Sequence, residues 1–470
     1  MKKGPLYRFR SLMLPGLKRW IVILMAGIIG IVIGILLLLG YHPIAVSGAF
    51  LREMLEHATD VIPHRASGIV LISVSGVVVG GAIIRMIISI VQAYGNQTES
   101  IPDVLYRRRH LERGPKVVVI GGGTGLPTLL RGMKRYTNNI TAIVTVGDDG
   151  GSSGRLRAEL GVLPPGDIRN CITALADEET LVTELFNYRF ESGGGLEGHS
   201  FGNLFLTALY TLTKGDFVES VRVAGRVLNM RGSVLPSTLE SIQLVAELED
   251  GRIIRGESHI TEACGRIKQL TLEPVHLKAT PAALEAIKYA ELIVIAPGSL
   301  YTSIIPNLLV PGVSDAIRKS KAKKIYVCNV LTQVGETLGY TVGDHVAAIL
   351  QHAREPGTVS ELEAIGPLLD CVLVNKKAPP LGDNSVFQEV ALDPEKLKAL
   401  GVEPVTGILI GKNSGHYHDS GKLAKNIMIW FGRKKKGIKK PPGETLEVKD
   451  ITLPETTTSE ESKEALATRR

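Results

Sequence analysis

The sequence has few cysteines, and their spacing excludes two kinds of structural site. Its 470 residues include only Cys171, Cys264, Cys328 and Cys371, which lie far apart and form no CxxC pair. Zinc sites and disulfide frameworks need cysteines at short or regular spacings. We therefore expect reduced and mostly buried thiols, with neither a zinc site nor a disulfide scaffold.

The chain also lacks the interleaved basic and aromatic residues that are typical of nucleic-acid-binding surfaces. Its net charge of +7 comes from cations beside apolar segments and in the tail. Such placement is typical of membrane topology. We expect no nucleic acid among the partners. The flanking cations are Lys2, Lys3, Arg8, Arg10, Lys18 and Arg19 before the first apolar run and Arg107, Arg108, Arg109 and Arg113 after the second.

Residues 21–40 contain no charge, and a helix needs about 20 such residues to cross about 30 Å of hydrocarbon. A cleaved signal peptide is the alternative, but its apolar region is shorter, and Tyr41-His42-Pro43 makes a poor cleavage site. A second apolar run covers residues 66–91. Within it, Arg85 would cost roughly 2.5 kcal/mol or more in mid-membrane, unless it lies near the cytoplasmic end and snorkels.

The basic flanks place both termini in the cytoplasm, with a short external loop between the two runs. We therefore predict a two-helix transmembrane hairpin and a juxtamembrane linker within residues 1–114, in the cell membrane, with the soluble domain cytoplasmic. A buried core helix is the alternative for the second run.

The soluble part begins with the signature of an open α/β sheet. Residues 116–120 form an apolar, β-branched run that predicts a central parallel strand. A helix over 124–135 with Thr124 as its cap and a second strand over 140–146 follow. The turn Gly121-Gly122-Gly123-Thr124-Gly125 offers free amides to a phosphate. Leu126 replaces the third glycine of GxGxxG, so a tight turn without a ligand is the alternative.

A second polar loop follows the second strand. Asp148 and Asp149 suit a ribose or a Mg²⁺ ion that a bound phosphate helps to hold, although an aspartate in a turn can simply cap amides. The next residues, Gly150 to Arg155, supply the hydroxyls of Ser152 and Ser153, the backbone of Gly154 and a guanidinium. A donor-rich loop of this kind suits an anion.

Three further segments are candidates for the same edge of the sheet. Asp167 can cap a helix whose first turn carries Arg169 and Asn170. His199, Ser200 and Asn203 open another helix, where His199 is a proton carrier, a base contact or a satisfied helix-start residue; no hydrolytic triad accompanies them. Hydroxyls and amides of the turn after residues 292–296 form a second anion or sugar cradle. Its members are Ser299, Tyr301, Thr302 and Ser303, with Asn329 delivered by the next strand.

Taken together, these motifs resemble the gluconeogenesis factor family (YvcK-like) and, beyond it, the phospholactate transferases of deazaflavin cofactor synthesis (CofD-like). The resemblance is dense over residues 116–352 and looser to Trp430. It rests on GGGTGL, VTVGDDGGSSGRLR, PPGDIRN, GHSFGNL, PGSLYTSIIPNLLVPG and NVLTQVGET. At Tyr417 the chain departs from relatives, which often have an arginine before the His-Asp pair. That departure weakens the inference that the C-terminal motif of the family contacts a nucleotide in this chain.

The resemblance implies an α/β, Rossmann-like, doubly wound parallel sheet over 115–430. An inserted β-hairpin is predicted near Asp250-Gly251. It also implies a regulator that binds a UDP-sugar or another nucleotide and governs cell shape and cell-wall precursor allocation during gluconeogenic growth. The alternative is a Mg²⁺-dependent transferase acting on a nucleotide-activated donor. An NAD-dependent oxidoreductase fits the fold but lacks a hydride-transfer constellation.

The expected partners are a nucleotide-sugar ligand, the bacterial cytoplasmic membrane, cell-wall synthesis proteins and further copies of the chain. Residues 431–470 are basic and then acidic, which predicts a disordered tail. Beside them, residues 427–431 are predicted to touch the inner leaflet.

Overall fold

The structure, a computed structural model, describes residues 17–39, 64–94, 111–177, 179–354, 366–376, 386–411, 417–435 and 446–447. The chain divides into two compact units, residues 1–109 and 110–470. Most of the predicted external loop, most of the juxtamembrane linker and most of the tail lie outside the described residues.

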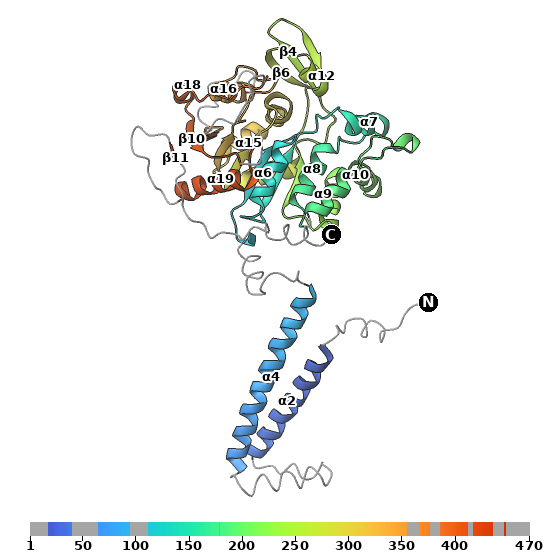
Figure 1. The fold of residues 1–470 in the computed structure, drawn as a ribbon, viewed down its shortest axis with the longest axis vertical. Coiled ribbons are helices and arrows are strands. Elements are labelled where there is room, and N and C mark those ends of the chain that lie inside the picture. Colours follow the sequence, from blue (N-terminus) through green and yellow to red (C-terminus); the bar gives the residue numbers. More distant parts are fainter. Residues whose placement is uncertain are drawn as a thin grey trace, which may run out of the picture. The chain divides into compact units, whose positions relative to one another are not determined.

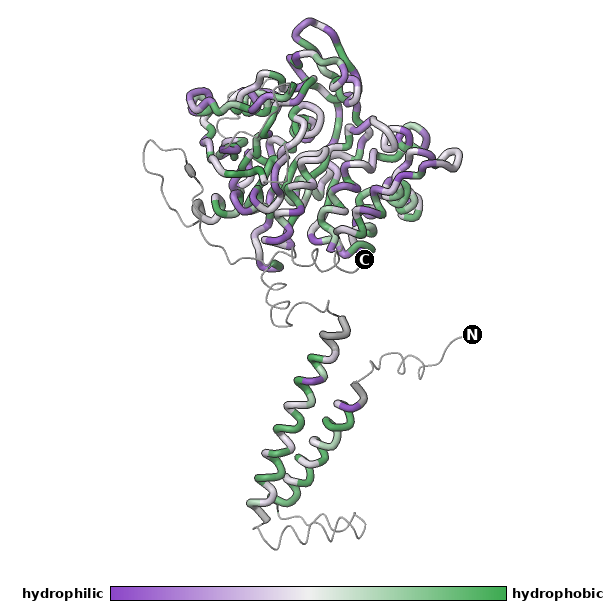
Figure 2. The backbone as a smooth tube through the Cα atoms, in the orientation of Figure 1, coloured by the Kyte–Doolittle hydropathy of each residue, from purple (hydrophilic) through white to green (hydrophobic). Residues whose placement is uncertain are grey.

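The first unit contains the two predicted apolar helices, α2 (Leu17–Leu38) and α4 (His64–Tyr94). Within them, residues 19–38 and 66–89 are long and apolar enough to cross a membrane. Figure 2 shows hydrophobic residues along nearly the whole length of both helices. The two helices are thus confirmed, and their crossing of a membrane stays a prediction.

Small residues allow α2 and α4 to approach closely. A Cβ atom at Gly30 would lie 2.3 Å from the Ser75 hydroxyl, and one at Gly34 would lie 2.7 Å from the Ile72 side chain. Such close contacts are typical of helix pairs in membranes. The Arg85 guanidinium lies 5.8 Å from the ring centroid of Trp20, at the start of α2. Arg85 therefore lies at the same end of the hairpin as the basic N-terminal flank, as its predicted snorkelling requires.

An eight-stranded parallel sheet organises the second unit, in the order β11-β10-β9-β8-β7-β1-β2-β3. Its central strand, β1, pairs with β2 on one side and with β7 on the other. The chain builds outward from β1 to β3 and then returns to build outward from β7. The order reverses between β1 and β7, which is where open α/β sheets bind ligands. The strands are β1 (Val117–Gly121), β2 (Ile140–Val144), β3 (Ser233–Pro236), β7 (Leu292–Ile295), β8 (Lys323–Val327), β9 (Cys371–Asn375), β10 (Glu403–Gly407) and β11 (Leu446–Glu447).

Helices cover both faces of this sheet. Helix α6 (Gly125–Met133) packs between α8 (Gly166–Leu175) and α19 (Ser420–Lys435) on one face. Because crossovers are right-handed, the reversal at β1 and β7 puts α15 (Val313–Lys319) on the other face. The other helices are α7 (Gly151–Leu160), α9 (Glu179–Asn187), α10 (Phe201–Leu212), α11 (Phe217–Val227), α13 (Pro281–Tyr289), α14 (Ile305–Leu309), α16 (Val342–His352) and α18 (Pro394–Ala399), with the short helical turns η2 (Gly194–Leu196) and η3 (Leu300–Ile304).

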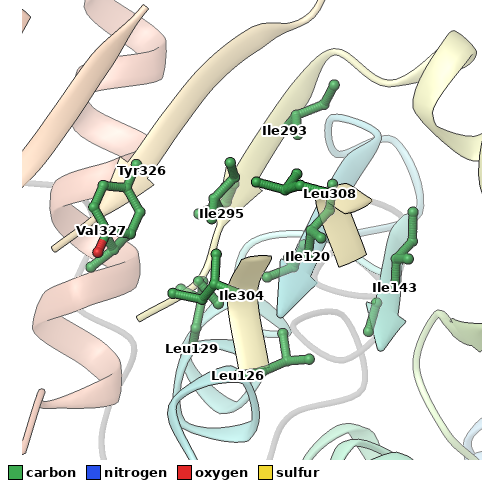
Figure 3. Packing of buried hydrophobic residues seen from close by; sticks show 14 of the residues in the cluster. Ile120, Leu126, Leu129, Ile143, Ile293, Ile295, Ile304, Leu308, Tyr326 and Val327 are labelled. Atoms are coloured by element: carbon green, nitrogen blue, oxygen red, sulfur yellow. The ribbon is translucent and has the colours of Figure 1, made fainter. Parts of the chain in front are cut away.

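Branched side chains from the central strands fill the core. Figure 3 shows Ile120, Ile143 and Ile295 of three neighbouring strands beside Leu126 and Leu129 of α6. All five are at most 1% exposed. The leucine that replaces the third glycine of the dinucleotide motif is therefore a core residue that fixes α6 to the sheet.

The C-terminal helix corrects one prediction. In α19, Ile427 and Trp430 are at most 2% exposed and belong to the core that includes α6. The predicted contact of residues 427–431 with the inner leaflet is therefore wrong. The helix extends to Lys435, and β11 adds to the edge of the sheet, so part of the predicted tail belongs to the fold.

The predicted hairpin insertion is present and has a third strand. Strands β4 (Gln243–Leu248), β5 (Ile253–Arg255) and β6 (Ile267–Glu273) form a separate antiparallel sheet. Helix α12 (Glu257–Glu262) lies between β5 and β6 in sequence, and this small sheet projects from the domain (Figure 1). All four cysteines are free, and only Cys264 is exposed.

Candidate functional site

The loops after β1 and β7 touch at the point where the strand order reverses. A Cβ atom at Gly125 would lie 1.9 Å from the carbonyl oxygen of Pro297, so only glycine permits this approach. Asn329, just beyond β8, fixes the second loop. Its side chain accepts a bond from the Gly298 amide at 3.0 Å and donates one to the Gly298 carbonyl at 2.8 Å. The two loops therefore form one rigid floor.

A cavity of about 600 Å³ opens on one side of this floor, within the size range of small-molecule sites. Thr124 lies at the N-cap position of α6, but its side chain makes no capping hydrogen bond, so the predicted cap is wrong. Its exposed side chain instead lines the cavity. In the described part of the chain, no acceptor pairs with the Thr124 amide. The lining residues are Thr124, Gly125, Thr128, Arg131, Pro297, Gly298, Asn329, Val330, Leu331, Thr332, Gln333, Phe387, Tyr417 and His418.

A smaller and more polar cavity of about 260 Å³ lies beside the loop after β2. The N-termini of α7 and α8 both contribute to its wall, and so do the guanidinium groups of Arg169 and Arg189. Helix N-termini and arginines both favour anions. The lining residues are Asp148, Gly150, Gly151, Ser152, Ser153, Gly166, Asp167, Arg169, Asn170, Arg189 and Asn203.

The predicted serine, histidine and asparagine side chains meet in one buried network beside this cavity. The Ser152 hydroxyl contacts His199 Nδ1 at 3.0 Å and accepts a bond from Asn203 Nδ2 at 3.1 Å. The Ser153 hydroxyl accepts a bond from the Gly166 amide, which ties α7 to α8. Burial lowers the pKa of His199, and Arg155 lowers it further. His199 is therefore a neutral partner that positions Ser152.

Arg169 is almost completely buried, and part of its hydrogen-bonding capacity is unused. It donates to the Ser200 hydroxyl at 2.7 Å and to Asn170 Oδ1 at 2.8 Å. Its Nε atom and Asn203 Oδ1 are buried without a partner in the described structure. Burial lowers the pKa of Arg169, and Arg189 adds to this effect. Unsatisfied buried groups that line or adjoin a cavity indicate a ligand or an ordered water.

Asp167 lines the smaller cavity and contacts the turn that borders the larger one. Its carboxylate accepts a hydrogen bond from the Gly123 amide at 2.7 Å, so it holds the loop after β1 and does not cap its own helix. Burial, together with the charge of Asp148, raises the pKa of Asp167 to about 6. Burial and then the carboxylates of Asp148 and Asp167 raise the pKa of Glu257 to about 9. The negative charge of Asp148 thus disfavours ionisation of both Asp167 and Glu257.

The two predicted metal ligands separate in the structure. Asp149 caps α12: its carboxylate accepts bonds from the Glu257 amide at 2.9 Å and from both the amide and the hydroxyl of Ser258. Asp148 lines the smaller cavity and accepts a bond from the Gly150 amide. Among the described residues, no group of three or more protein ligands could hold a metal unaided. Asp148 and Asp167 are carboxylates of the kind that Mg²⁺ prefers, but they could hold the ion only if other oxygen ligands completed its coordination.

The hydroxyl-rich turn after β7 does not offer all its predicted groups to an anion. Buried Glu336 accepts bonds from the Tyr301 amide at 2.9 Å and from the Thr302 hydroxyl at 2.8 Å. The Ser299 hydroxyl accepts a bond from Gln333. The chain's own carboxylate therefore occupies this anion site, and the expected free cradle is wrong for Tyr301 and Thr302. Ser303 remains next to the Gly122–Gly123 backbone.

Two other predicted residues, Arg155 and Gly154, stabilise the loops around the smaller cavity. Arg155 donates to the Glu197 carbonyl at 2.7 Å and holds the glycine-rich segment before His199. A Cβ atom at Gly154 would lie 2.0 Å from the Asp149 carbonyl oxygen, so Gly154 permits the tight start of α7. Sequence reasoning missed Arg189, Glu257 and Phe387, which belong to no recognised motif. It also missed Glu336, which lies within NVLTQVGET but was not singled out, and it discounted His418 because of its neighbour Tyr417.

The sequence matches a known family model and several named relatives. The family model described as 2-phospho-L-lactate transferase CofD matches residues 117–410. The Bacillus subtilis protein named gluconeogenesis factor is 48% identical over 320 residues, which cover 67% of this chain and 97% of that one. A Nostoc sp. protein that also carries a gluconeogenesis factor name is 48% identical over 434 residues, covering 89% of this chain and 91% of the relative.

The fold also matches a solved structure. A crystal structure of a Bacillus halodurans protein superimposes with a TM-score of 0.61 at 46% sequence identity. The match covers 67% of this chain and the whole of that chain.

Proposed function

Since the chain belongs to the family of the 2-phospho-L-lactate transferase CofD and its relatives are named gluconeogenesis factors, we propose that it binds a nucleotide sugar, in particular a UDP-sugar. The larger cavity takes the nucleoside, and the smaller cavity takes the diphosphate. The glycine turn after β1 lies between the two and donates amides to the phosphate chain.

One observation carries this proposal: two cavities of different chemistry are linked through the glycine turn. Thr124 and Gly125 line the larger cavity, and Asp167, which lines the smaller one, accepts a hydrogen bond from Gly123. The larger is lined mostly by apolar and aromatic groups, including Val330, Leu331 and Phe387. The smaller gathers two guanidinium groups and two helix N-termini. A nucleoside diphosphate has the same division between a flat, largely apolar end and an anionic end. The Asp167 bond to Gly123 holds the turn in place between them.

A Mg²⁺ ion belongs to this proposal. Asp148 and Asp167 would hold it together with the diphosphate, and it would neutralise charge on both. The pKa of Asp167, which burial raises and the charge of Asp148 raises further, supports this assignment, because a cation beside the two carboxylates would offset both effects. Arg169 and Arg189 orient the diphosphate from the protein side.

We further propose that the protein is a regulator, which senses a UDP-sugar and thereby governs cell shape and cell-wall precursor allocation during gluconeogenic growth. The hairpin of α2 and α4 would tether it to the cytoplasmic membrane, with the second unit in the cytoplasm. The match to the Nostoc relative extends over 434 residues, which is longer than the second unit, residues 110–470. The match therefore includes part of the first unit, which supports a retained hairpin. Tethering would raise its local concentration near membrane-bound wall enzymes.

The second candidate is a Mg²⁺-dependent transferase of the phospholactate transferase type. It is favoured by the family membership and by the acidic group of Asp148, Asp167 and Glu257 beside the anion-binding cavity. Glu257, protonated at neutral pH, would be a proton donor to a leaving oxygen. The two candidates share the same ligand site and differ in whether a bond breaks.

A binding and turnover panel distinguishes them. Full-length protein in detergent is titrated calorimetrically with UDP-glucose and UDP-N-acetylglucosamine, with and without Mg²⁺, and the mixtures are then analysed for cleaved nucleotide. Saturable binding with intact ligand supports the regulator, and nucleotide release that depends on a deazaflavin acceptor supports the transferase. Absence of binding to every nucleotide sugar contradicts the proposal.

Arg189 offers a matched variant for this panel. Its side chain is exposed and lines the smaller cavity, so Arg189→Gln should leave the fold intact while lowering affinity at least about tenfold. Arg222→Gln is the control, because Arg222 is also exposed but pairs with Glu219 on α11, away from this cavity. Equal affinities for the two variants would remove Arg189 from the site.

A further inference from the structure

His418 lines the larger cavity and has an unused hydrogen-bond acceptor. It lies in the short segment before α19 and lines the cavity next to Tyr417. Its ring is anchored by a hydrogen bond to the backbone of Cys328, which follows β8. Its Nε2 atom is buried and has no partner among the described residues. Because Nε2 is the unpaired atom, the anchoring bond uses Nδ1.

The anchor fixes which ring nitrogen carries the proton. The backbone carbonyl of Cys328 can only accept, so Nδ1 must donate, and Nε2 keeps its lone pair as long as the ring is neutral. Burial lowers the pKa of His418 to about 4, so the ring is neutral at physiological pH. His418 therefore requires an N–H or O–H donor from whatever fills the cavity beside it.

The groups around His418 suit a flat aromatic ligand. Val330 and Leu331 form a small apolar cluster with Ile410. The rings of Phe387 and Tyr417 are 46% and 73% exposed, and both line the same cavity. Stacking on exposed aromatic rings holds any nucleobase and does not select among bases. The selection must then come from a polar group at the base edge.

We infer that His418 selects the base of the bound nucleotide by accepting a hydrogen bond from its ring N–H group. This inference rests on the proposed nucleotide-sugar function and names its specificity-determining residue. Uracil has such a donor at N3, and guanine has one at N1. Cytosine N3 and adenine N1 are bare acceptors, which would face Nε2 lone pair against lone pair. In this orientation the site therefore favours uracil or guanine nucleotides over cytosine and adenine nucleotides, whose amino groups would reach Nε2 only if the base moved along the cavity wall.

A buried acceptor left without a donor weakens binding by a predictable factor. Losing one such hydrogen bond reduces affinity roughly tenfold to a hundredfold. Sites built to pair a polar group discriminate strongly against analogues that lack the partner. Uracil and cytosine have nearly the same size and stack similarly, so their comparison isolates the hydrogen bond.

Two variants of His418 separate the acceptor from the anchor. In His418→Asn, the side-chain amide can still donate to the Cys328 carbonyl, but no atom takes the place of Nε2. In His418→Gln, the longer side chain can present its carbonyl oxygen at the Nε2 position. The wild-type full chain and both variants are titrated in detergent with UDP-, CDP-, GDP- and ADP-glucose, and melting temperatures check the fold.

The expected wild-type result is at least tenfold tighter binding of UDP-glucose than of CDP-glucose. His418→Asn should reduce this ratio to about one, mainly through weaker UDP-glucose binding, and His418→Gln should restore part of it. A His418→Asn variant that keeps the wild-type ratio would overturn the inference, as would equal wild-type binding of UDP- and CDP-glucose. In both cases nucleotide-sugar binding itself survives, whereas failure of all four ligands to bind overturns the proposed function and this inference together.

Discussion

The Asp167 carboxylate accepts a hydrogen bond from the Gly123 amide at 2.7 Å, and this bond joins the start of α8 to the turn after β1. Asp167 lines the smaller cavity, and Thr124, the residue after Gly123, lines the larger one. The carboxyl group of Asp167 would therefore lie close to any diphosphate bound along this turn. The ionisation of Asp167 should therefore control how tightly an anionic ligand binds.

We expect the affinity for UDP-glucose without Mg²⁺ to fall about tenfold as pH rises from 5 to 7.5. The pKa of Asp167 is about 6, so Asp167 gains its negative charge in this range, whereas the diphosphate is already fully ionised. Mg²⁺ should flatten the profile because it screens the carboxylate from the diphosphate. Calorimetric titration at several pH values checks this. The Asp167→Asn variant should bind with little pH dependence, and a profile as steep as wild type would assign the effect to another group.

Glu257 should make the ligand-free protein less stable as pH rises. Its pKa is raised from an ordinary value of 4.5 to about 9, so the unfolded chain loses this proton at lower pH than the folded one. The stabilisation from the protonated form is complete below about pH 4.5 and is lost as pH rises through 9, by about 1 kcal/mol for each pH unit. Urea unfolding at pH 5, 7 and 9 measures it.

The matched variant for this test is Glu257→Gln, which keeps the size of the side chain and cannot ionise. It should retain at pH 9 most of the stability that it has at pH 5. Parallel pH profiles for Glu257→Gln and wild type would show that the Glu257 carboxyl ionises normally in the folded protein.

Gly125→Ala should destabilise the second unit by at least about 2 kcal/mol, because the added methyl group would overlap the Pro297 carbonyl oxygen and push apart the loops after β1 and β7. Gly195→Ala is the control, since a Cβ atom there would meet nothing within 4 Å. The two melting temperatures provide the comparison. If they are equally high, the two loops separate without cost and do not form a rigid floor.

The full chain should stay in the membrane fraction after extraction with alkaline carbonate, because α2 and α4 each contain an apolar stretch long enough to cross the bilayer. A chain that lacks residues 1–109 should be recovered in the soluble fraction. The Bacillus halodurans structure supports this control, because its whole chain matches 67% of this one. Release of the full chain by carbonate would mean that the two helices do not span the membrane.

Local sequence patterns predict most of the sheet and its ligand-binding edge. The β-branched runs at 116–120, 140–146 and 292–296 become β1, β2 and β7, because strands buried on both faces need apolar residues without interruption. Glycine turns after the first two strands likewise indicate close backbone approach. Each of these inferences needs only the residues of one short segment of the chain.

The partners that occupy or complete the site come from distant segments, and no local pattern encodes which residues will pair. Glu336 fills the anion position at Tyr301 from 35 residues away, and Asp149 is drawn to α12 from 109 residues away. His418 meets Cys328 only because α19 packs on the sheet domain. The sequence could not predict the burial of Ile427 and Trp430 either, since an apolar stripe beside a basic tail suits a membrane surface as well as a protein core.

The most direct test of the account is to map where the base of a bound UDP-sugar lies. Full-length protein in detergent is irradiated with 5-azido-UDP-glucose, digested and analysed by mass spectrometry, with and without excess UDP-glucose. If the nucleoside binds in the larger cavity, protected adducts should form within residues 329–333, at Phe387 or at residues 417–418, which line it. Protected adducts confined to residues 148–170 beside the smaller cavity, or no protected adduct at all, would contradict the account.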